Sequence, residues 1–263
     1  MGLFSFLSSV TEKVTNLCFL LFSCLLVSGC ASLLQTDREA AELHFRMGTS
    51  FLANGAYPQA LEELSTAEKL DSQSAPIQNN LGLVYFLRGK YELAEKYLLR
   101  ALELSPKYSD ARNNLSRVYI EQKKYPLAIQ EATAVLNDLT YPFPEKPYYN
   151  LALAQFHQNM FQAAEQNFLK VIEIQRDHCL ALSYYGRCLF EQKEYKRSSL
   201  ALDKAVGFCQ KNQFDEPNYF SALSYFRQGD LTKTEARLHE IIKLYPQGKY
   251  VDKARDMLET IKK

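Results

Sequence analysis

The sequence predicts an all-α protein, a right-handed superhelical solenoid of six helical hairpins closed by a C-terminal capping helix. Two observations support this prediction. Small residues occur in pairs twelve positions apart, and such pairs recur about every 34 residues along the chain. Around the pairs, apolar residues follow a helical period that short turns interrupt. Because one hairpin cannot bury its apolar face alone, repeated hairpins must stack on one another.

Residues 75–108 are the clearest unit. They show one amphipathic helix, a turn at Gly89, a second amphipathic helix and a stop at Pro106. Gly82 and Ala94 are small, which lets the two helices approach closely where they face each other. The spacing of the small, aromatic and proline positions is that of the tetratricopeptide repeat, whose period is about 34 residues.

The same template fits six units in the repeat region 38–248. The units are about 41–74, 75–108, 109–144, 145–178, 179–214 and 215–248. Their paired small residues are Gly48/Ala60, Gly82/Ala94, Ser116/Ala128, Ala152/Ala164, Gly186/Ser198 and Ala222/Thr234. The remaining C-terminal residues, 249–263, are predicted to form one more amphipathic helix that covers the last hairpin.

Residues 1–29 are predicted to be a lipoprotein signal peptide. Residues 17–27 form an apolar run of 11 residues, which is shorter than the roughly 20 that a helix needs to span a bilayer. The tetrapeptide that ends at Cys30, Val-Ser-Gly-Cys, resembles the bacterial lipobox, whose cysteine is lipidated and becomes the new N-terminus. The alternative is that Cys30 is an unmodified cysteine of an apolar helix.

Lipidation of Cys30 would fix the location of the chain. Several acyl chains on one residue anchor it firmly, because each buried methylene contributes about 0.8 kcal/mol. Ala31 and Ser32 follow the cysteine without an aspartate, and by resemblance to the sorting rules of such lipoproteins this favours the outer membrane. Residues 30–37 are then a lipidated tether that holds the repeats on the periplasmic face.

Composition and motifs favour a binding protein over an enzyme. The formal net charge is +1, so the balance indicates neither a nucleic-acid-binding surface nor an acidic tail. The four histidines lie apart in the sequence and have no metal-ligand spacing to a cysteine. No phosphate-binding glycine loop, nucleophile elbow or paired-carboxylate motif is present in the sequence. We therefore expect no catalytic residue, cofactor, metal or small-molecule substrate.

Function is instead expected on the face lined by the first helices of the hairpins, which is concave in arrays of this kind. Asparagines run through repeats 2 to 4 of this face, and aromatic residues run through repeats 4 to 6. An asparagine side chain both donates and accepts, which suits an extended peptide, although asparagine is also common there in generic repeats. Aromatic residues are favoured at protein interfaces. The predicted groove residues are Asn79, Asn80, Asn113, Asn114, Tyr149, Asn150, Tyr184, Tyr219 and Phe220.

The junction between repeats 3 and 4 departs from the regular period. It is two residues longer than the other early junctions and carries three prolines within residues 140–147. Proline cannot continue a helix, so this segment is predicted to be extended. Its aromatic residues, Tyr141 and Phe143, form either a loop that contacts a partner or a spacer whose rings pack back into the groove.

The cysteines of repeat 5 suggest one crosslink. Cys179 is expected at the start of the first helix and Cys209 at the end of the second, so antiparallel packing brings them to the same end of the hairpin. In an oxidising compartment a Cys179–Cys209 disulfide would join them. Cys188 lies nine residues after Cys179, roughly 13 Å along one helix, which is too far to bond. The alternative is three unbonded thiols.

A lipobox followed by six tetratricopeptide repeats resembles the type IV pilus assembly lipoproteins of the PilF/PilW/Tgl kind, which act as pilotins. The more specific residues of this resemblance are the run from Asn79 to Tyr85, and Tyr141, Pro142, Pro144, Pro147 and Asn150. In repeat 3, Ser116 stands where the family has a glycine, and no cysteine follows the asparagines. The resemblance implies a periplasm-facing outer-membrane lipoprotein that binds secretin subunits and promotes their assembly into the pore through which the pilus passes.

Two other functions use the same physical parts. One is a lipoprotein scaffold for other envelope enzymes, such as cell-wall synthases or proteases. The other is a component of a different secretion or gliding apparatus. The genes that neighbour this one would separate these alternatives, because pilus motor and secretin genes favour the pilotin.

Overall fold

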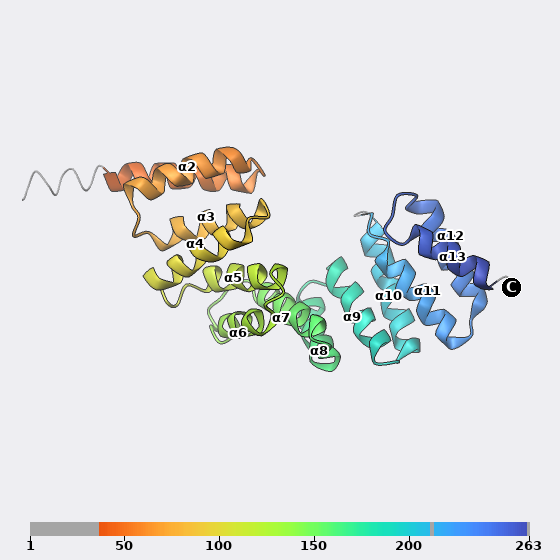
Figure 1. Cartoon of the computed structure of the whole chain (residues 1–263). Helices are drawn as coiled ribbons and strands as arrows, with labels where there is room; N and C mark the ends of the chain where they lie inside the picture. Colours follow the sequence, from red (N-terminus) through yellow and green to blue (C-terminus); the bar gives the residue numbers. More distant parts are fainter. Residues whose placement is uncertain (1–36, 211–212, 262–263) are drawn as a thin grey trace, which may run out of the picture.

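The computed structural model describes residues 37–210 and 213–261, which form one curved array of antiparallel helices (Figure 1). The predicted signal peptide, Cys30 and nearly all of the tether lie outside the described residues. Within those ranges, no helix is long and apolar enough to cross a bilayer. The all-α solenoid that the sequence predicts is confirmed.

The helices pair into six hairpins followed by one more helix. Residues 37–53 are helical and precede α2 (Tyr57–Leu70). The next four hairpins are α3 (Ala75–Leu87) with α4 (Tyr91–Leu104), α5 (Ser109–Glu121) with α6 (Tyr125–Leu136), α7 (Glu145–His157) with α8 (Phe161–Ile174), and α9 (Cys179–Glu191) with α10 (Tyr195–Cys209). The last hairpin is α11 (Glu216–Gln228) with α12 (Leu231–Leu244), and α13 (Val251–Ile261) packs on α12.

The array has an inner and an outer side. Successive first helices contact one another, from α3 to α5, α7, α9 and α11, whereas the second helices that the structure describes make no comparable contacts with each other. The first helices therefore follow the shorter, concave arc, and the second helices lie on the convex side. This arrangement places the side chains of the first helices on one continuous inner face.

Each hairpin closes at its pair of small residues. A Cβ atom added to Gly82 would lie 2.6 Å from Leu98 Cγ, and one added to Gly186 would lie 2.5 Å from Leu202 Cγ. Both leucines are fully buried. In these two hairpins the helices therefore touch at a distance that leaves no room for a side chain, and this close contact fixes the shape of the hairpin.

The turn inside each hairpin requires one residue with a left-handed backbone. Gly55, Gly89 and Gly229 supply it in three hairpins, and Lys123, Asn159 and Lys193 occupy the same place in the other three with φ between 60° and 63°. Glycine adopts this conformation without steric cost, and other residues pay of order 1 kcal/mol. The sequence thus tolerates local strain at three turns to keep the hairpin geometry constant.

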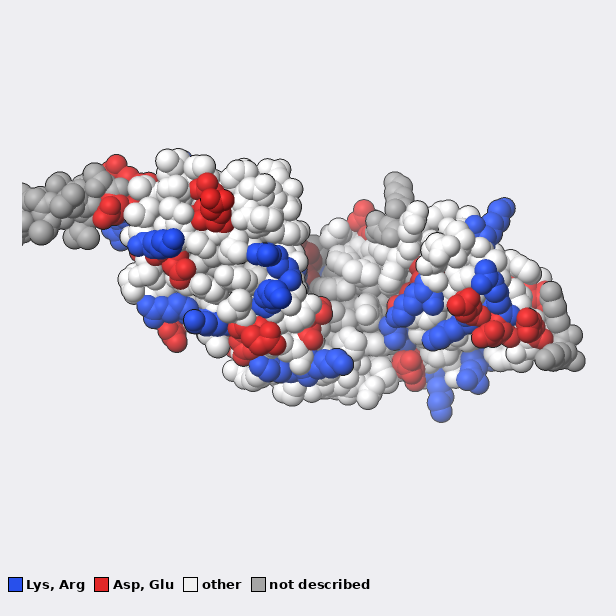
Figure 2. All heavy atoms as spheres, turned by 45° about the horizontal axis from the view of Figure 1, so that its top comes forward, with Lys and Arg blue, Asp and Glu red and all other residues white. Residues whose placement is uncertain are grey.

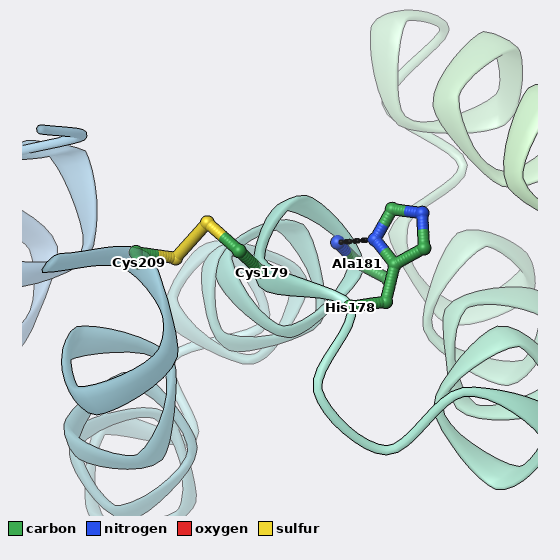
Figure 3. The surroundings of a disulfide bond; sticks show 4 residues. All are labelled: His178, Cys179, Ala181 and Cys209. Atoms are coloured by element: carbon green, nitrogen blue, oxygen red, sulfur yellow. Dashed lines mark hydrogen bonds between the residues drawn. A yellow bond between two sulfur atoms is a disulfide. The ribbon is translucent and has the colours of Figure 1, made fainter. Parts of the chain in front are cut away.

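A disulfide joins the two ends of the fifth hairpin. Cys179 begins α9 and Cys209 ends α10, with Cα atoms 5.0 Å apart (Figure 3). Closing a loop of this length removes unfolded-state entropy worth about 3–4 kcal/mol in the chain-entropy model. Cys188 is the free, buried cysteine of the described chain, and burial raises the pKa of its thiol to about 12.

Two glycine substitutions test the packing of the hairpins. Gly82→Ala should lower the free energy of unfolding by about 1–3 kcal/mol, because the added Cβ would lie 2.6 Å from Cγ of buried Leu98 and 3.2 Å from the Ala94 carbonyl oxygen, so the two helices must shift. Gly207 lies within α10 with nothing near its missing Cβ, so Gly207→Ala should raise that free energy by about 0.5–1 kcal/mol. Urea unfolding followed by circular dichroism measures both, and a shift of the same sign in both variants would contradict this account.

Candidate partner-binding face

The inner face divides into an amide-rich part and an aromatic part. The amide-rich part runs through repeats 1 to 4 and forms a chain of side-chain hydrogen bonds. Asn80 Nδ2 on α3 donates to Thr49 Oγ1 of the first repeat at 2.9 Å, and Asn79 Nδ2 donates to Asn80 Oδ1 at 3.0 Å. Asn114 Nδ2 on α5 donates to Asn79 Oδ1 at 3.0 Å. These bonds connect three successive repeats.

Asn150 continues the connection from repeat 4 back to repeat 3. Its Nδ2 lies 2.9 Å from Ser116 Oγ, 3.0 Å from Asn113 Oδ1 and 3.3 Å from the Asn113 carbonyl oxygen. Ser116 is fully buried, and its hydroxyl donates to the same carbonyl. A buried amide with this many partners holds two helices in register, because leaving its partners unpaired is costly.

The structure corrects part of the predicted groove. Asn79, Asn113 and Asn150 are only 4%, 4% and 5% exposed, so the prediction that they present their amides to a peptide is wrong. They lie where neighbouring first helices contact each other, and their hydrogen bonds join repeats instead. Asn80 and Asn114 are half-buried and also take part in this chain. In these repeats the asparagine side chains therefore hold neighbouring repeats together.

The aromatic part centres on Arg187 of α9, which the sequence analysis missed. Its guanidinium carbon lies 4.6 Å from the ring centre of Phe156, 4.6 Å from that of Phe220 and 5.2 Å from that of Tyr184. Its Nη1 donates to Glu216 Oε1 of α11 at 2.6 Å, and the Glu216 side chain is only 7% exposed. A cation held against three rings and paired with a buried carboxylate fixes α7, α9 and α11 relative to one another.

Further rings extend this part in both directions. Tyr149 contacts the rings of Phe168 and His178, with centres 5.9 Å and 5.1 Å apart. Tyr219 stacks on Tyr250 with ring centres 4.6 Å apart. Burial raises the pKa of the Tyr149 and Tyr219 phenols, and that of Tyr250 to about 12. These phenols therefore stay neutral at physiological pH and can donate hydrogen bonds.

The aromatic part remains open to a partner. Tyr149, Tyr184, Tyr219 and Phe220, which the sequence predicts for the groove, are all half-buried. On α11, Phe226 is 39% exposed and lies seven residues after Tyr219, on the same side of the helix. The rings thus keep accessible faces while their neighbours hold them in place. This is the arrangement that protein-binding surfaces favour.

The proline-rich junction gives its two aromatic residues different surroundings, although their rings contact each other edge to face with centres 6.1 Å apart. Tyr141 packs back onto the array, where its hydroxyl donates to Asp110 Oδ1 at 3.1 Å. Phe143 is 46% exposed, and Lys146 Nζ lies 4.0 Å from its ring centre. Tyr141 therefore packs back onto the repeats, as expected of a spacer, whereas the exposed part of Phe143 can contact a partner.

The described residues show no arrangement suited to metal binding. No group of three or more histidine, cysteine, aspartate or glutamate side chains is placed to hold an ion in these ranges. Basic and acidic side chains are interspersed over the face that Figure 2 shows.

Comparisons with known proteins agree with this geometry. Models described as tetratricopeptide repeat match residues 73–138, 145–178 and 221–248, and one described as TPR repeat matches residues 48–87. Together the matches span more than half of the chain. No curated protein sequence matches the chain significantly.

Three solved structures show the same fold at low sequence identity. PilF of Pseudomonas aeruginosa has a TM-score of 0.70 at 21% identity, over 81% of this chain and 95% of that one. PilW, described as a widely conserved type IV pilus biogenesis factor, has a TM-score of 0.74 at 14% identity, over 81% and 97%. YrrB, described as a TPR protein with an unusual peptide-binding site, has a TM-score of 0.58 at 16% identity, over 70% and 93%.

The structural role of the amide chain is tested at Asn150. Asn150→Ala should lower the free energy of unfolding by about 1–3 kcal/mol, because it leaves buried acceptors on Asn113 and Ser116 without their donor. Asn167 is the matched control, since its half-buried amide bonds within hairpin 4 only, and Asn167→Ala should cost less than about 1 kcal/mol. Equal losses of unfolding free energy in the two variants, measured by urea unfolding, would show that hydrogen bonds between repeats stabilise the chain no more than those within a hairpin.

The N-terminus of α9 predicts a pH dependence of stability. His178 Nδ1 accepts from the Ala181 N–H at 3.2 Å (Figure 3), and burial lowers the pKa of the ring below its usual value. The unfolded chain therefore binds more protons below about pH 6.5, and the free energy of unfolding falls as the pH drops from about 7 to 5.

His178→Asn should make this fall smaller, because asparagine caps a helix without titrating. Tm measured by circular dichroism at several pH values gives the slope for each chain, whatever the absolute stability of the variant. His157, whose pKa burial also lowers, is present in both chains and leaves a residual slope. An unchanged slope in His178→Asn would refute the assignment.

Proposed function

We propose, from the premise that this chain is a tetratricopeptide-repeat protein, that it is a lipid-anchored pilotin of the outer membrane. In this proposal it binds subunits of the type IV pilus secretin in the periplasm and promotes their assembly or localisation. The observation that carries the binding role is the aromatic part of the inner face, where rings from α7, α9 and α11 surround Arg187.

The energetics of this surface support protein binding. Partners lose less free energy to ordering when the receiving side chains are already fixed, and the ion pair between Arg187 and Glu216 fixes the rings of Tyr184 and Phe220 before binding. Exposed apolar surface, such as that of Phe226, gains about 25 cal/mol for each Å² that a partner covers. A segment of the partner that lies along α7, α9 and α11 would contact all of these rings.

Two features support the location and the partner. The lipobox resemblance at Cys30 provides the membrane anchor, and the Cys179–Cys209 disulfide suits the oxidising periplasm. The likeness of the fold to PilF and PilW, the latter described as a type IV pilus biogenesis factor, supports the choice of the pilus apparatus. PilF and PilW match nearly over their full lengths.

A scaffold for other envelope machinery is the second candidate. Cell-wall synthases, proteases, or a secretion or gliding apparatus would use the same anchor and the same aromatic surface. YrrB, a tetratricopeptide protein of similar fold, is described as having an unusual peptide-binding site, which supports peptide binding without naming the machine. The identity of the bound protein separates the two candidates.

The test follows the secretin in membrane fractions. Deleting the gene should abolish the heat- and detergent-resistant secretin multimers seen by immunoblot, and the wild-type gene should restore them. Phe226→Glu should fail to restore them, because burying its carboxylate against a partner costs several kcal/mol. Leu231→Glu is the matched control, since Leu231 is 46% exposed on second helix α12, and it should restore them fully. The Cys30→Ser chain should leave the membrane fraction.

Two results would contradict the proposal in different ways. Multimers that persist in the deletion strain would exclude the pilotin role and favour a scaffold for another machine. Multimers that Phe226→Glu restores as well as the wild type does would exclude the aromatic part of the inner face as the binding surface.

A further inference from the structure

A hollow lies on the convex side of the array, opposite the inner face. It is bounded by α8 and α10, with α9 between them as its floor, and its volume is about 710 Å³. Its apolar lining consists of Leu169, Ile172, Leu182, Tyr185, Leu200, Ala201 and Phe208. We call this hollow the outer groove. It shares no residue with the aromatic part of the inner face.

The curvature of the array explains why a hollow exists here. First helices contact one another on the inner side, so second helices such as α8 and α10 diverge on the outer side. The disulfide then holds the end of α10 against the start of α9, and Cys179 and Cys209 pack with Leu182 and Ala205 in one buried cluster. The walls of the outer groove are therefore rigid at this end.

Leu200 distinguishes the outer groove from the equivalent places in the other hairpins. It is the sixth residue of α10 and is 58% exposed. The sixth residue of the second helix in the other repeats is polar in four cases and small in one: Glu62, Lys96, Gln130, Gln166 and Ala236. Phe208 of the same groove is 47% exposed. Two large apolar side chains at the rim of a hollow lose contact with water only when something docks there.

The charges around the outer groove indicate what docks. Arg176, Arg197 and Lys204 line it, and Glu173 is its acidic residue. Glu173 pairs with Lys170, at 2.9 Å. Arg197 already contacts Glu165 and Glu194.

Arg176 and Lys204 form no ion pair with the residues that the structure describes. The groove thus offers apolar surface together with unpaired positive charge, and its complement is apolar and acidic.

We propose that the outer groove docks an amphipathic, acidic helical segment of a partner protein. Such a segment would place apolar side chains at helical spacing against Leu200 and Phe208, and its carboxylates beside Arg176 and Lys204. A single acyl chain fits less well, because the exposed rim would leave much of it in water and its one carboxylate matches only one of the cations. The inference does not depend on the proposed function of the inner face.

A designed peptide tests the proposal directly. The probe is a fluorescein-labelled amphipathic helix of about 14 residues, with leucines at positions i, i+3, i+4 and i+7 and glutamates beside them. Fluorescence anisotropy against the mature chain should show saturable binding. Replacing the glutamates of the peptide by lysines should weaken binding at least about tenfold, since two unpaired cations would then face like charges.

Matched variants locate the binding. Leu200→Glu, and separately Arg176→Glu with Lys204→Glu, should each weaken binding at least about tenfold. Leu127→Glu, at a leucine that is 42% exposed on α6, should leave it unchanged. All of these residues are at the surface or the rim, and an unchanged Tm verifies that the variants fold.

Several results would overturn the proposal. One is the absence of saturable binding, and another is equal binding by Leu200→Glu and Leu127→Glu. Saturable binding of added dodecanoate without any binding of the peptide would identify a lipid site instead. Self-association of the wild type in sedimentation velocity that Leu200→Glu abolishes would make the outer groove an interface between two copies.

Discussion

The close contact between the two helices of each hairpin is the constraint on which the rest of the structure depends. At Gly82 and Gly186 the helices leave no room for a Cβ atom, so the crossing of these two hairpins is fixed by contact between backbone and buried leucine. With the hairpin geometry fixed, successive first helices pack against one another and the second helices diverge. Concave and convex faces of different character follow from this one contact.

The inner face uses polar and aromatic side chains for different purposes. In repeats 1 to 4, amide side chains such as Asn79 and Asn150 bond across the boundaries between repeats and are buried. In repeats 4 to 6, an ion pair between Arg187 and Glu216 replaces the amides, and the rings around it keep accessible faces. The first part gives the array its register, and the second gives it a surface on which a protein can bind.

The sequence predicted what is local and missed what depends on neighbouring repeats. Turns, small-residue pairs and helical period lie within 34 residues, so the six hairpins and the antiparallel placement of Cys179 and Cys209 could be inferred. Whether Asn150 faces solvent or Asn113 depends on the rotation of one repeat against the next, which no single repeat encodes. Arg187 pairs with Glu216, which lies 29 residues later in the chain and in the next repeat. A charged residue among aromatic positions of α9 was the available signal for that pair.

The central claim is that partners bind the aromatic part of the inner face, while the amide-rich part serves the architecture. Hydrogen exchange of the mature chain, measured by mass spectrometry with and without the periplasmic domain of the proposed secretin partner, tests it most directly. The account predicts slower exchange on binding in α9 and α11, with α3 and α5 unchanged. Slower exchange confined to α3 and α5 would contradict it.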